Sequence, residues 1–372
     1  MKTRLMMIVF LFIAYLVILT GHMILYFFLS RSFFVSNPEA RINLAIILLA
    51  LSMTFLISSV LVHLYSSFLT RIFYTISGLW LGLMLNLIIA FSFSFFVYYF
   101  LSFLPFNLSL KMFSIVSVLL ALLFSIYGVY NVYNIKIEEV NISRGTWPEV
   151  WKDKNVVFLS DVHLGETLGE SFLERLILKI NSLDPNIVLI GGDLFDGIDG
   201  HLEEFSKLID KIEAREGIYF VSGNHETYMR GVDYSTELKK TKVHILEDEL
   251  IEIDGVQIVG ISYPEMHGLK NMTETLNLIN SYKKEIPSIL LFHEPKNIGA
   301  MKEAGINLML SGHTHKGQMW PFGFVTKYLF KGADYGLLEK DDFSIYTSSG
   351  AGVWGPNMRT SGKSEIVKII FN

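Results

Sequence analysis

The sequence predicts two parts of different fold class, an all-α domain of four transmembrane helices and then an α/β domain. Four apolar runs fill the first 133 residues. Short β-branched runs then alternate with helical patterns, which is typical of an α/β fold. The two parts also differ in charge. We expect a helical domain over 1–133, a linker over 134–153 and the α/β domain over 154–372.

The apolar runs cover residues 5–29, 42–64, about 76–100 and about 112–133. Each has the length of about 20 residues that crosses roughly 30 Å of hydrocarbon. The first run lacks the small-residue cleavage pattern of a signal peptide, so we expect it to be retained; a cleaved leader is the alternative. Pro105 and Asn107 predict a turn between the third and fourth helices.

Charge separates the two parts further. The first 133 residues carry six basic side chains and one acidic one, which leaves 25 basic and 35 acidic side chains for the rest. The acidic second part argues against nucleic acid as a partner, because such binding depends on Lys and Arg. The chain has no Cys, which excludes disulfides and thiolate metal ligands.

Orientation follows from the basic residues in short loops. With the N-terminus inside, the inner flanks hold five of them: Lys2, Arg4, Arg71, Lys136 and Arg144. The outer flanks hold three: Arg31, Arg41 and Lys111. The excess of basic residues in the inner flanks favours an integral, multi-pass membrane protein whose α/β domain lies in the cytoplasm.

Two local patterns predict elements of the α/β domain. Ser171 followed by Glu174 indicates a capping box at the start of an amphipathic helix. Its apolar face would hold Phe172, Leu173, Leu176, Ile177 and Ile180. Further along, Asp254-Gly255 between two β-branched runs predicts a hairpin.

Five apolar runs that are typical of buried strands each end in polar residues able to bind a metal. These residues are Asp161 and His163, then Asp193, then Asn224 and His225, then His293, and finally His313 and His315. Ligands bind at the carboxyl ends of strands in open α/β sheets, so we expect the eight side chains to converge on one rim. Glycines at 192, 223 and 312 allow close approach of the backbone there.

Taken without His225, the set offers two Asp, one Asn and four His, which is enough for two metals. Imidazole with carboxylate suits divalent Mn, Fe or Zn better than Mg or Ca, and we expect Mn. Asp193 is the best candidate to bridge ions roughly 3.5 to 4 Å apart. Each motif alone has a plainer interpretation, a turn or a structural histidine, and the ordered series carries the prediction.

The ordered series resembles the calcineurin-like metallophosphoesterase family over roughly residues 153–372. The segments 316–322 and 349–359 are similar to those of a bacterial phosphodiesterase branch with membrane-linked, lipid-directed members. The four-span architecture resembles transmembrane proteins with a metallophosphoesterase domain. Lys316 stands where the branch usually has Gly, which puts the local loop geometry in doubt. Glu226 replaces the commoner Asp.

The resemblance implies a four-layer sandwich of two mixed β-sheets flanked by helices. It implies one metal held by Asp161, His163, Asp193 and His315, and another held by Asp193, Asn224, His293 and His313. It leaves His225 free for catalysis, although bracing of its loop is the alternative. A hydroxide between the metals would attack phosphorus, while the cations neutralise the phosphate oxygens.

We therefore expect a membrane-anchored hydrolase that cleaves a phosphoester or pyrophosphate bond, with a lipid-linked or membrane-associated substrate. The alternatives are a tethered phosphodiesterase for soluble nucleotides and a metal-binding membrane scaffold or sensor without turnover. An aromatic cluster over 320–330 could line an acyl pocket or pack a loop. Arg359 could contact substrate phosphate, but a role in stabilising the fold is the preferred interpretation.

Overall fold

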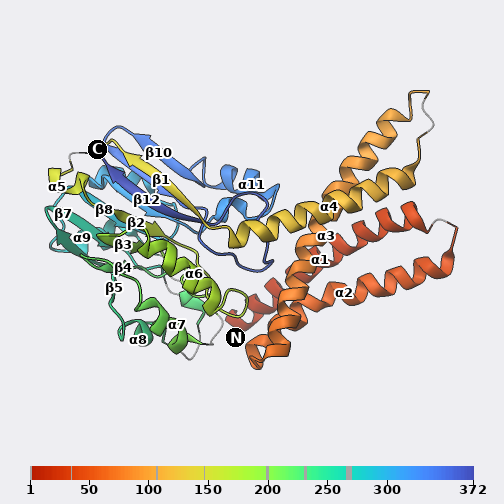
Figure 1. Cartoon of the computed structure of the whole chain (residues 1–372), viewed down its shortest axis with the longest axis horizontal. Helices are drawn as coiled ribbons and strands as arrows, with labels where there is room; N and C mark the ends of the chain where they lie inside the picture. The colour runs from red at the N-terminus through yellow and green to blue at the C-terminus, as the bar shows by residue number, and fades with distance from the viewer. Residues whose placement is uncertain are drawn as a thin grey trace. The chain divides into compact units, whose positions relative to one another are not determined.

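The structure, a computed structural model, describes residues 2–34, 36–105, 108–145, 147–197, 201–229, 233–264 and 270–372. The side chains of residues 2–8 and 10 are outside this description. The chain forms two compact units (Figure 1). A helical unit contains Met1–Val129 with Gly355–Met358, and an α/β unit contains Tyr130–Trp354 with Arg359–Asn372.

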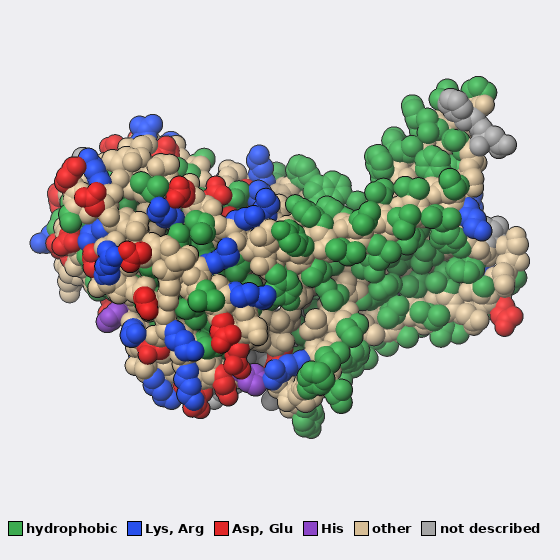
Figure 2. Space-filling model, in the orientation of Figure 1, with side chains coloured by type: hydrophobic (Ala, Val, Ile, Leu, Met, Phe, Trp, Pro, Cys, Tyr) green, Lys and Arg blue, Asp and Glu red, His purple; other side chains and the backbone are tan. Residues whose placement is uncertain are grey.

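Four long helices build the N-terminal part, as predicted: α1 (Lys2–Phe33), α2 (Pro38–Leu64), α3 (Phe68–Leu101) and α4 (Leu110–Tyr133). Each is long and apolar enough to cross a membrane. Large side chains such as Val17, Phe96 and Leu123 are 67%, 70% and 64% exposed. Hydrophobic side chains cover these helices in Figure 2. Such a continuous apolar surface is unfavourable in water and matches hydrocarbon.

Local capping sets the helix starts. The Asn37 side chain accepts a hydrogen bond from Ala40 N at the start of α2. Ser67 and Thr70 form a capping box that starts α3 at Phe68, earlier than the expected residue 76. Polar residues near the start of α3 lower the hydropathy there, so hydropathy alone did not predict its first turns. Between α3 and α4, Pro105 lies in a bend, and Asn107 lies outside the described residues.

The α/β unit contains two six-stranded mixed sheets. The first has the order β1 (Lys136–Ile142), β12 (Glu365–Phe371), β2 (Val156–Leu159), β3 (Ile187–Ile190), β4 (Ile218–Phe220) and β5 (Val243–Ile245). The second has the order β10 (Gly336–Lys340), β11 (Phe343–Thr347), β9 (Leu308–Ser311), β8 (Ser288–Leu291), β7 (Val256–Gly260) and β6 (Glu249–Ile253). Strands β2 to β5 are parallel, as are β7, β8, β9 and β11.

Helices cover the outer faces of both sheets, which confirms the four-layer sandwich. The first sheet carries α6 (Glu170–Asn181), α7 (Leu202–Ile209) and α8 (Tyr234–Leu238), and the second carries α9 (Met272–Leu278) and α10 (Ile298–Ala304). The unit also contains α5 (Glu149–Lys152), whose Trp151 packs between the sheets, α11 (Phe322–Leu329), which has no buried residue, and the 3-10 turns η1 (Glu226–Tyr228) and η2 (His315–Gly317). Alternation along the strands divides the core. Phe158 and Leu291 pack between the sheets. Leu159 faces the side that carries α6 and α7, and Leu290 the side that carries α9 and α10.

The structure corrects one expected boundary, because residues 136–142 are a strand rather than part of a linker. Strand β1 pairs in parallel with β12 along its whole length, from Lys136 beside Glu365 to Ile142 beside Phe371. Only Val140 and Ile142 are buried in it. An edge strand with so few apolar positions lacks the alternation that identifies strands in a sequence.

A second correction concerns the start of α6. The helix begins at Glu170, and its N-cap residue, Gly169, has no side chain to accept a hydrogen bond, so Ser171 lies inside the helix rather than capping it. The amphipathic face is as predicted, with Phe172, Leu173, Leu176, Ile177 and Ile180 all buried. The hairpin is also confirmed, since β6 and β7 are antiparallel and Ile253 pairs with Val256 across the turn.

Candidate metal centre

The expected strands all form, but they belong to both sheets. Strands β2, β3 and β4 of the first sheet lead to the sites at 161–163, 193 and 224–225, and β8 and β9 of the second lead to 293 and 313–315. The rim therefore combines the carboxyl ends of two sheets instead of one. Two facing sheets can present ligands from opposite sides, which a single open sheet cannot do.

The predicted ligands form one cluster in the α/β unit, in which all but the partly exposed His313 are buried. Three groups have ligand atoms close enough to hold an ion: Asp161 with His163 and His315, His163 with Asp193 and His225, and Asp193 with His293 and His313. Consecutive groups share His163 and then Asp193. The Nε2 atoms of His163 and His315 lie 3.0 Å apart, and His293 Nε2 lies 3.0 Å from Asp193 Oδ2.

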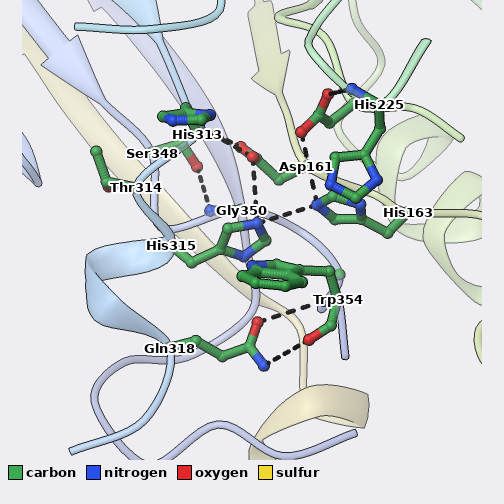
Figure 3. Close-up of polar contacts among 12 residues, drawn as sticks. Asp161, His163, His225, His313, Thr314, His315, Gln318, Ser348, Gly350 and Trp354 are labelled. Atoms are coloured by element: carbon green, nitrogen blue, oxygen red, sulfur yellow. Dashed lines mark hydrogen bonds and ion pairs between the residues drawn. The ribbon is translucent and has the colours of Figure 1, made fainter. Parts of the chain in front are cut away.

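Asn224 joins this cluster through its side-chain oxygen. Its Oδ1 lies 2.9 Å from Nδ1 of His313, and its amide nitrogen faces the Tyr228 hydroxyl at 3.4 Å. Backbone amides fix the two carboxylates. His313 N donates to both oxygens of Asp161, and His225 N donates to Asp193 Oδ1 at 2.8 Å. Figure 3 shows His163, His313 and His315 gathered around Asp161.

The backbone of the predicted ligands is unusual. Five of them have positive φ: Asp161 (53°), His163 (52°), Asp193 (52°), His313 (71°) and His315 (49°). Left-handed conformations are uncommon in residues other than glycine, and strain of this kind concentrates at functional sites. Residue types alone give no sign of it, and sequence reasoning did not anticipate it.

Two glycines are required for close approach. A Cβ at Gly312 would collide with the Asp161 carboxylate and Ser160, and one at Gly223 would collide with Asp193. Both neighbours are fixed by backbone hydrogen bonds, so neither can move aside. These contacts explain why glycine precedes His313 and Asn224, as the sequence suggested.

Charge in the cluster is strongly coupled. Burial raises the pKa of Asp161. Burial also raises the pKa of Asp193, but the neighbouring His293 outweighs it and takes that pKa well below its usual value. The Asp193 carboxylate in turn overcomes the burial of His293 and raises its pKa to about 10. Burial, and then the charge of His293, lower the pKa of His313 to about 3.

The donor set fits divalent cations. His163 Nδ1 is buried and makes no hydrogen bond within the described part of the chain, and His293 Nε2 is buried against the Asp193 carboxylate at 3.0 Å. Two imidazole nitrogens that face each other at 3.0 Å also leave at most one proton between them. Buried carboxylates that face several imidazole nitrogens at close range are the arrangement that a metal ion completes.

Sequence reasoning did not identify two residues that hold the site together. The Asp196 backbone oxygen lies 2.9 Å from Nδ1 of His225, and its carboxylate lies 3.6 Å from Nδ1 of His163. Glu226, noted only as a replacement for Asp, accepts from the amides of Asp193, Phe195 and Gly223 at 2.9, 3.0 and 2.7 Å. Burial, and then the Asp193 charge, raise the pKa of Glu226 to about 7. The sequence feature that could have identified them is the position of each carboxylate, since Asp196 follows shortly after Asp193 and Glu226 directly follows His225.

The structure also places Lys316 and Arg359. Lys316 has φ 52°, so this position keeps the left-handed conformation that glycine favours, and its Nζ lies 3.9 Å from the centroid of the Tyr335 ring. Arg359 is fully buried and donates to Gly352 O, and its Nη2 lies 3.0 Å from Nδ1 of His315. These contacts are those of a residue that stabilises the fold, the preferred interpretation.

Comparison with known proteins agrees with this geometry. The family model of calcineurin-like phosphoesterases matches residues 154–317. An uncharacterized metallophosphoesterase of Campylobacter jejuni is 35% identical over 63% of this chain and 63% of its own length. One from Helicobacter pylori is 32% identical over 58% of the chain and 59% of its own. A transmembrane protein with metallophosphoesterase domain from Danio rerio is 31% identical over 63% and 57%.

The chain spans less than two thirds of the length of each of these relatives. A solved structure from Thermus thermophilus aligns with 54% of this chain and 89% of its own, with 10% identity and a TM-score of 0.37. The matched residues 154–317 contain every predicted metal ligand and His225. This chain therefore carries a calcineurin-like metallophosphoesterase domain.

Proposed function

We propose that this chain is a membrane-anchored hydrolase that uses two divalent metal ions to cleave a phosphoester or pyrophosphate bond in a lipid-linked or membrane-associated substrate. The family match implies the broader activity, a metal-dependent phosphoester hydrolase, and the four apolar helices support membrane association. The observation that carries the two-metal proposal is the buried cluster whose three ligand groups are linked by His163 and Asp193.

In this proposal, Asp161, His163, Asp193 and His315 hold one ion. Asp193, Asn224, His293 and His313 hold the other, so Asp193 belongs to both sets. When bound, the ions would neutralise phosphate oxygens and lower the pKa of water at the site. Imidazole and carboxylate donors without thiolate are compatible with Mn, Fe or Zn, and we propose Mn.

His225 is the proposed catalytic acid. Its ring lies 4.5 Å from that of His163, centroid to centroid, and the Asp196 backbone oxygen lies beside its Nδ1. Burial lowers the pKa of His225, but the carboxylates of Asp193 and Asp196 outweigh it and raise this pKa above its usual value. A protonated ring next to the reacting phosphate can donate a proton from Nε2 to the leaving oxygen.

An exposed apolar helix beside the metal centre supports a lipid-linked substrate. No described residue of α11 is buried, and Phe324, Tyr328 and Leu329 are 69%, 83% and 64% exposed. The aromatic cluster continues to Phe330, whose ring centroid lies 6.2 Å from that of His313. These residues therefore do not form a packed loop, and an apolar surface that leads to the ligands is suited to an acyl chain.

The substrate class can be tested with the full-length, Mn-loaded protein in mixed micelles. We expect a higher kcat/KM for a phospholipid ester than for a soluble aryl phosphodiester. Phe324→Asn with Tyr328→Asn should reduce lipid turnover and leave aryl turnover unchanged. Leu178→Asn, an exposed apolar residue of α6 (69% exposed), is the control. A preference for cyclic nucleotides would favour the tethered nucleotide phosphodiesterase, and metal binding without turnover would favour the scaffold.

A further inference from the structure

Trp354 presents an exposed indole beside the metal centre. Its side chain is 53% exposed, although the chain on its N-terminal side is buried. The indole centroid lies 6.3 Å from the His225 ring, and the His225 ring lies 4.5 Å from His163. A single imidazole thus separates the indole from a proposed metal ligand.

The backbone of Trp354 is held on both of its polar groups by one side chain. Gln318 Nε2 donates to Trp354 O at 2.9 Å, and Trp354 N donates to Gln318 Oε1 at 3.3 Å, as Figure 3 shows. Gln318 is only 7% exposed and follows the η2 turn that contains His315. The same short segment therefore positions a proposed metal ligand and Trp354.

A second set of bonds ties this loop to the end of β2. Ala351 N donates to Ser160 O at 2.9 Å, and Gly352 N donates to Asp161 O at 2.8 Å. The position of Trp354 is therefore set by the two segments that carry Asp161 and His315. A large apolar ring on a fixed backbone contributes little to the fold while half exposed, but it binds a ligand with little loss of conformational entropy.

We infer that Trp354 contacts the apolar or aromatic part of the substrate's leaving group, and that Gln318 is the positioning residue for this contact. The inference rests on the proposed function, because His225 is the proposed donor to the leaving oxygen and Trp354 is its neighbour. The contact is non-covalent and sets specificity: substrates with a larger apolar leaving group gain binding at the indole face.

The test compares two phosphodiesters whose leaving phenols are similar in acidity but differ in ring area, methyl phenyl phosphate and methyl 2-naphthyl phosphate. The full-length, Mn-loaded protein should have the higher kcat/KM for the naphthyl ester. Trp354→Ala should reduce this ratio roughly threefold to tenfold, the range of an aromatic contact. Trp354→Phe should recover part of it, and metal content should not change.

Two further variants separate positioning from contact. Gln318→Leu removes both hydrogen bonds to Trp354, so it should lower the naphthyl-to-phenyl ratio of kcat/KM in the same direction as Trp354→Ala. Leu278→Ala removes an exposed apolar side chain of α9, 74% exposed, that lies outside the aromatic cluster and the proposed site. It should leave the ratio unchanged.

A binding experiment keeps the test independent of turnover. Calorimetry with phosphonates measures binding alone, since neither C–P bond is hydrolysed. Trp354→Ala should weaken the binding of 2-naphthylphosphonate more than that of phenylphosphonate. An unchanged preference in both the kinetic and the binding experiments, with metal retained, would overturn the inference. Absence of metal-dependent turnover in the original protein would instead contradict the proposed function, and the phosphonate comparison would still decide the role of Trp354.

Discussion

Asp193 occupies the centre of the proposed site, since it belongs to two of the three ligand groups. Its Oδ2 lies 3.0 Å from His293 Nε2 and 3.9 Å from His163 Nε2. Asp193→Asn keeps the shape but removes the charge shared by both ions. We expect metal content to fall below two per chain and kcat to fall by at least about 100-fold, since even outer partners of ligands are worth 10–100-fold. Elemental analysis and phosphodiester hydrolysis check both effects.

His225 should behave differently from Asp193. His225→Ala should lower kcat by about 100- to 10,000-fold, the usual contribution of a proton donor, with two metals per chain retained. His225 also lies within ligand range of His163 and Asp193, so loss of metal in this variant would identify it as a ligand instead. His201→Ala, on a histidine outside the ligand groups of the described chain, is the control.

At the scale of single residues, the sequence predicted which side chains come together better than it predicted their backbone conformations. The eight predicted residues lie close together in the structure, and they could be predicted because strand ends, glycines and metal-binding side chains leave a visible pattern. The left-handed backbone at Asp161 and His315 was not predictable, since tertiary contacts impose it. The Gln318–Trp354 pair joins positions far apart in the chain, and no local pattern connects them.

Among the helices and strands, α6 offers a direct test of how much its buried face stabilises the α/β unit. Leu176 is 1% exposed and Leu178 is 69% exposed on the same helix. Leu176→Ala should destabilise the α/β unit by about 2 to 5 kcal/mol through lost burial and a cavity. Leu178→Ala should change stability by no more than about 0.5 kcal/mol. The two variants are compared by thermal unfolding of the full chain in detergent, with the protease sensitivity of the α/β unit as the readout. Equal effects would contradict this packing.

Strands that are buried on both faces were the easiest elements to predict. The short, continuous apolar runs of β2, β3, β8 and β9 favour a buried strand over other secondary structure. The edge strand β1 and the start of α6 were missed because solvent exposure and a glycine cap remove the usual signals. The division of the strands between two sheets depends on long-range pairing, which only the family resemblance supplied.

For the whole molecule, the proposed topology places the α/β unit in the cytoplasm with an even number of spans. The chain has no Cys, so single cysteines report location without background. In cells, Ser36→Cys should react with a membrane-impermeant maleimide from outside, whereas Ser66→Cys and Asp342→Cys should react only after lysis. Labelling of Asp342→Cys in intact cells would reverse the orientation.

Metal reconstitution of the full-length protein tests the central claim most directly. The protein would be stripped with chelator, titrated with Mn, Fe(II) or Zn, and measured for bound metal and for hydrolysis of an aryl phosphodiester and a phospholipid ester. The account predicts two ions per chain, with activity that is absent in the stripped protein and returns as both sites fill. Hydrolysis that survives stripping, or two bound ions without turnover of any phosphoester, would contradict it.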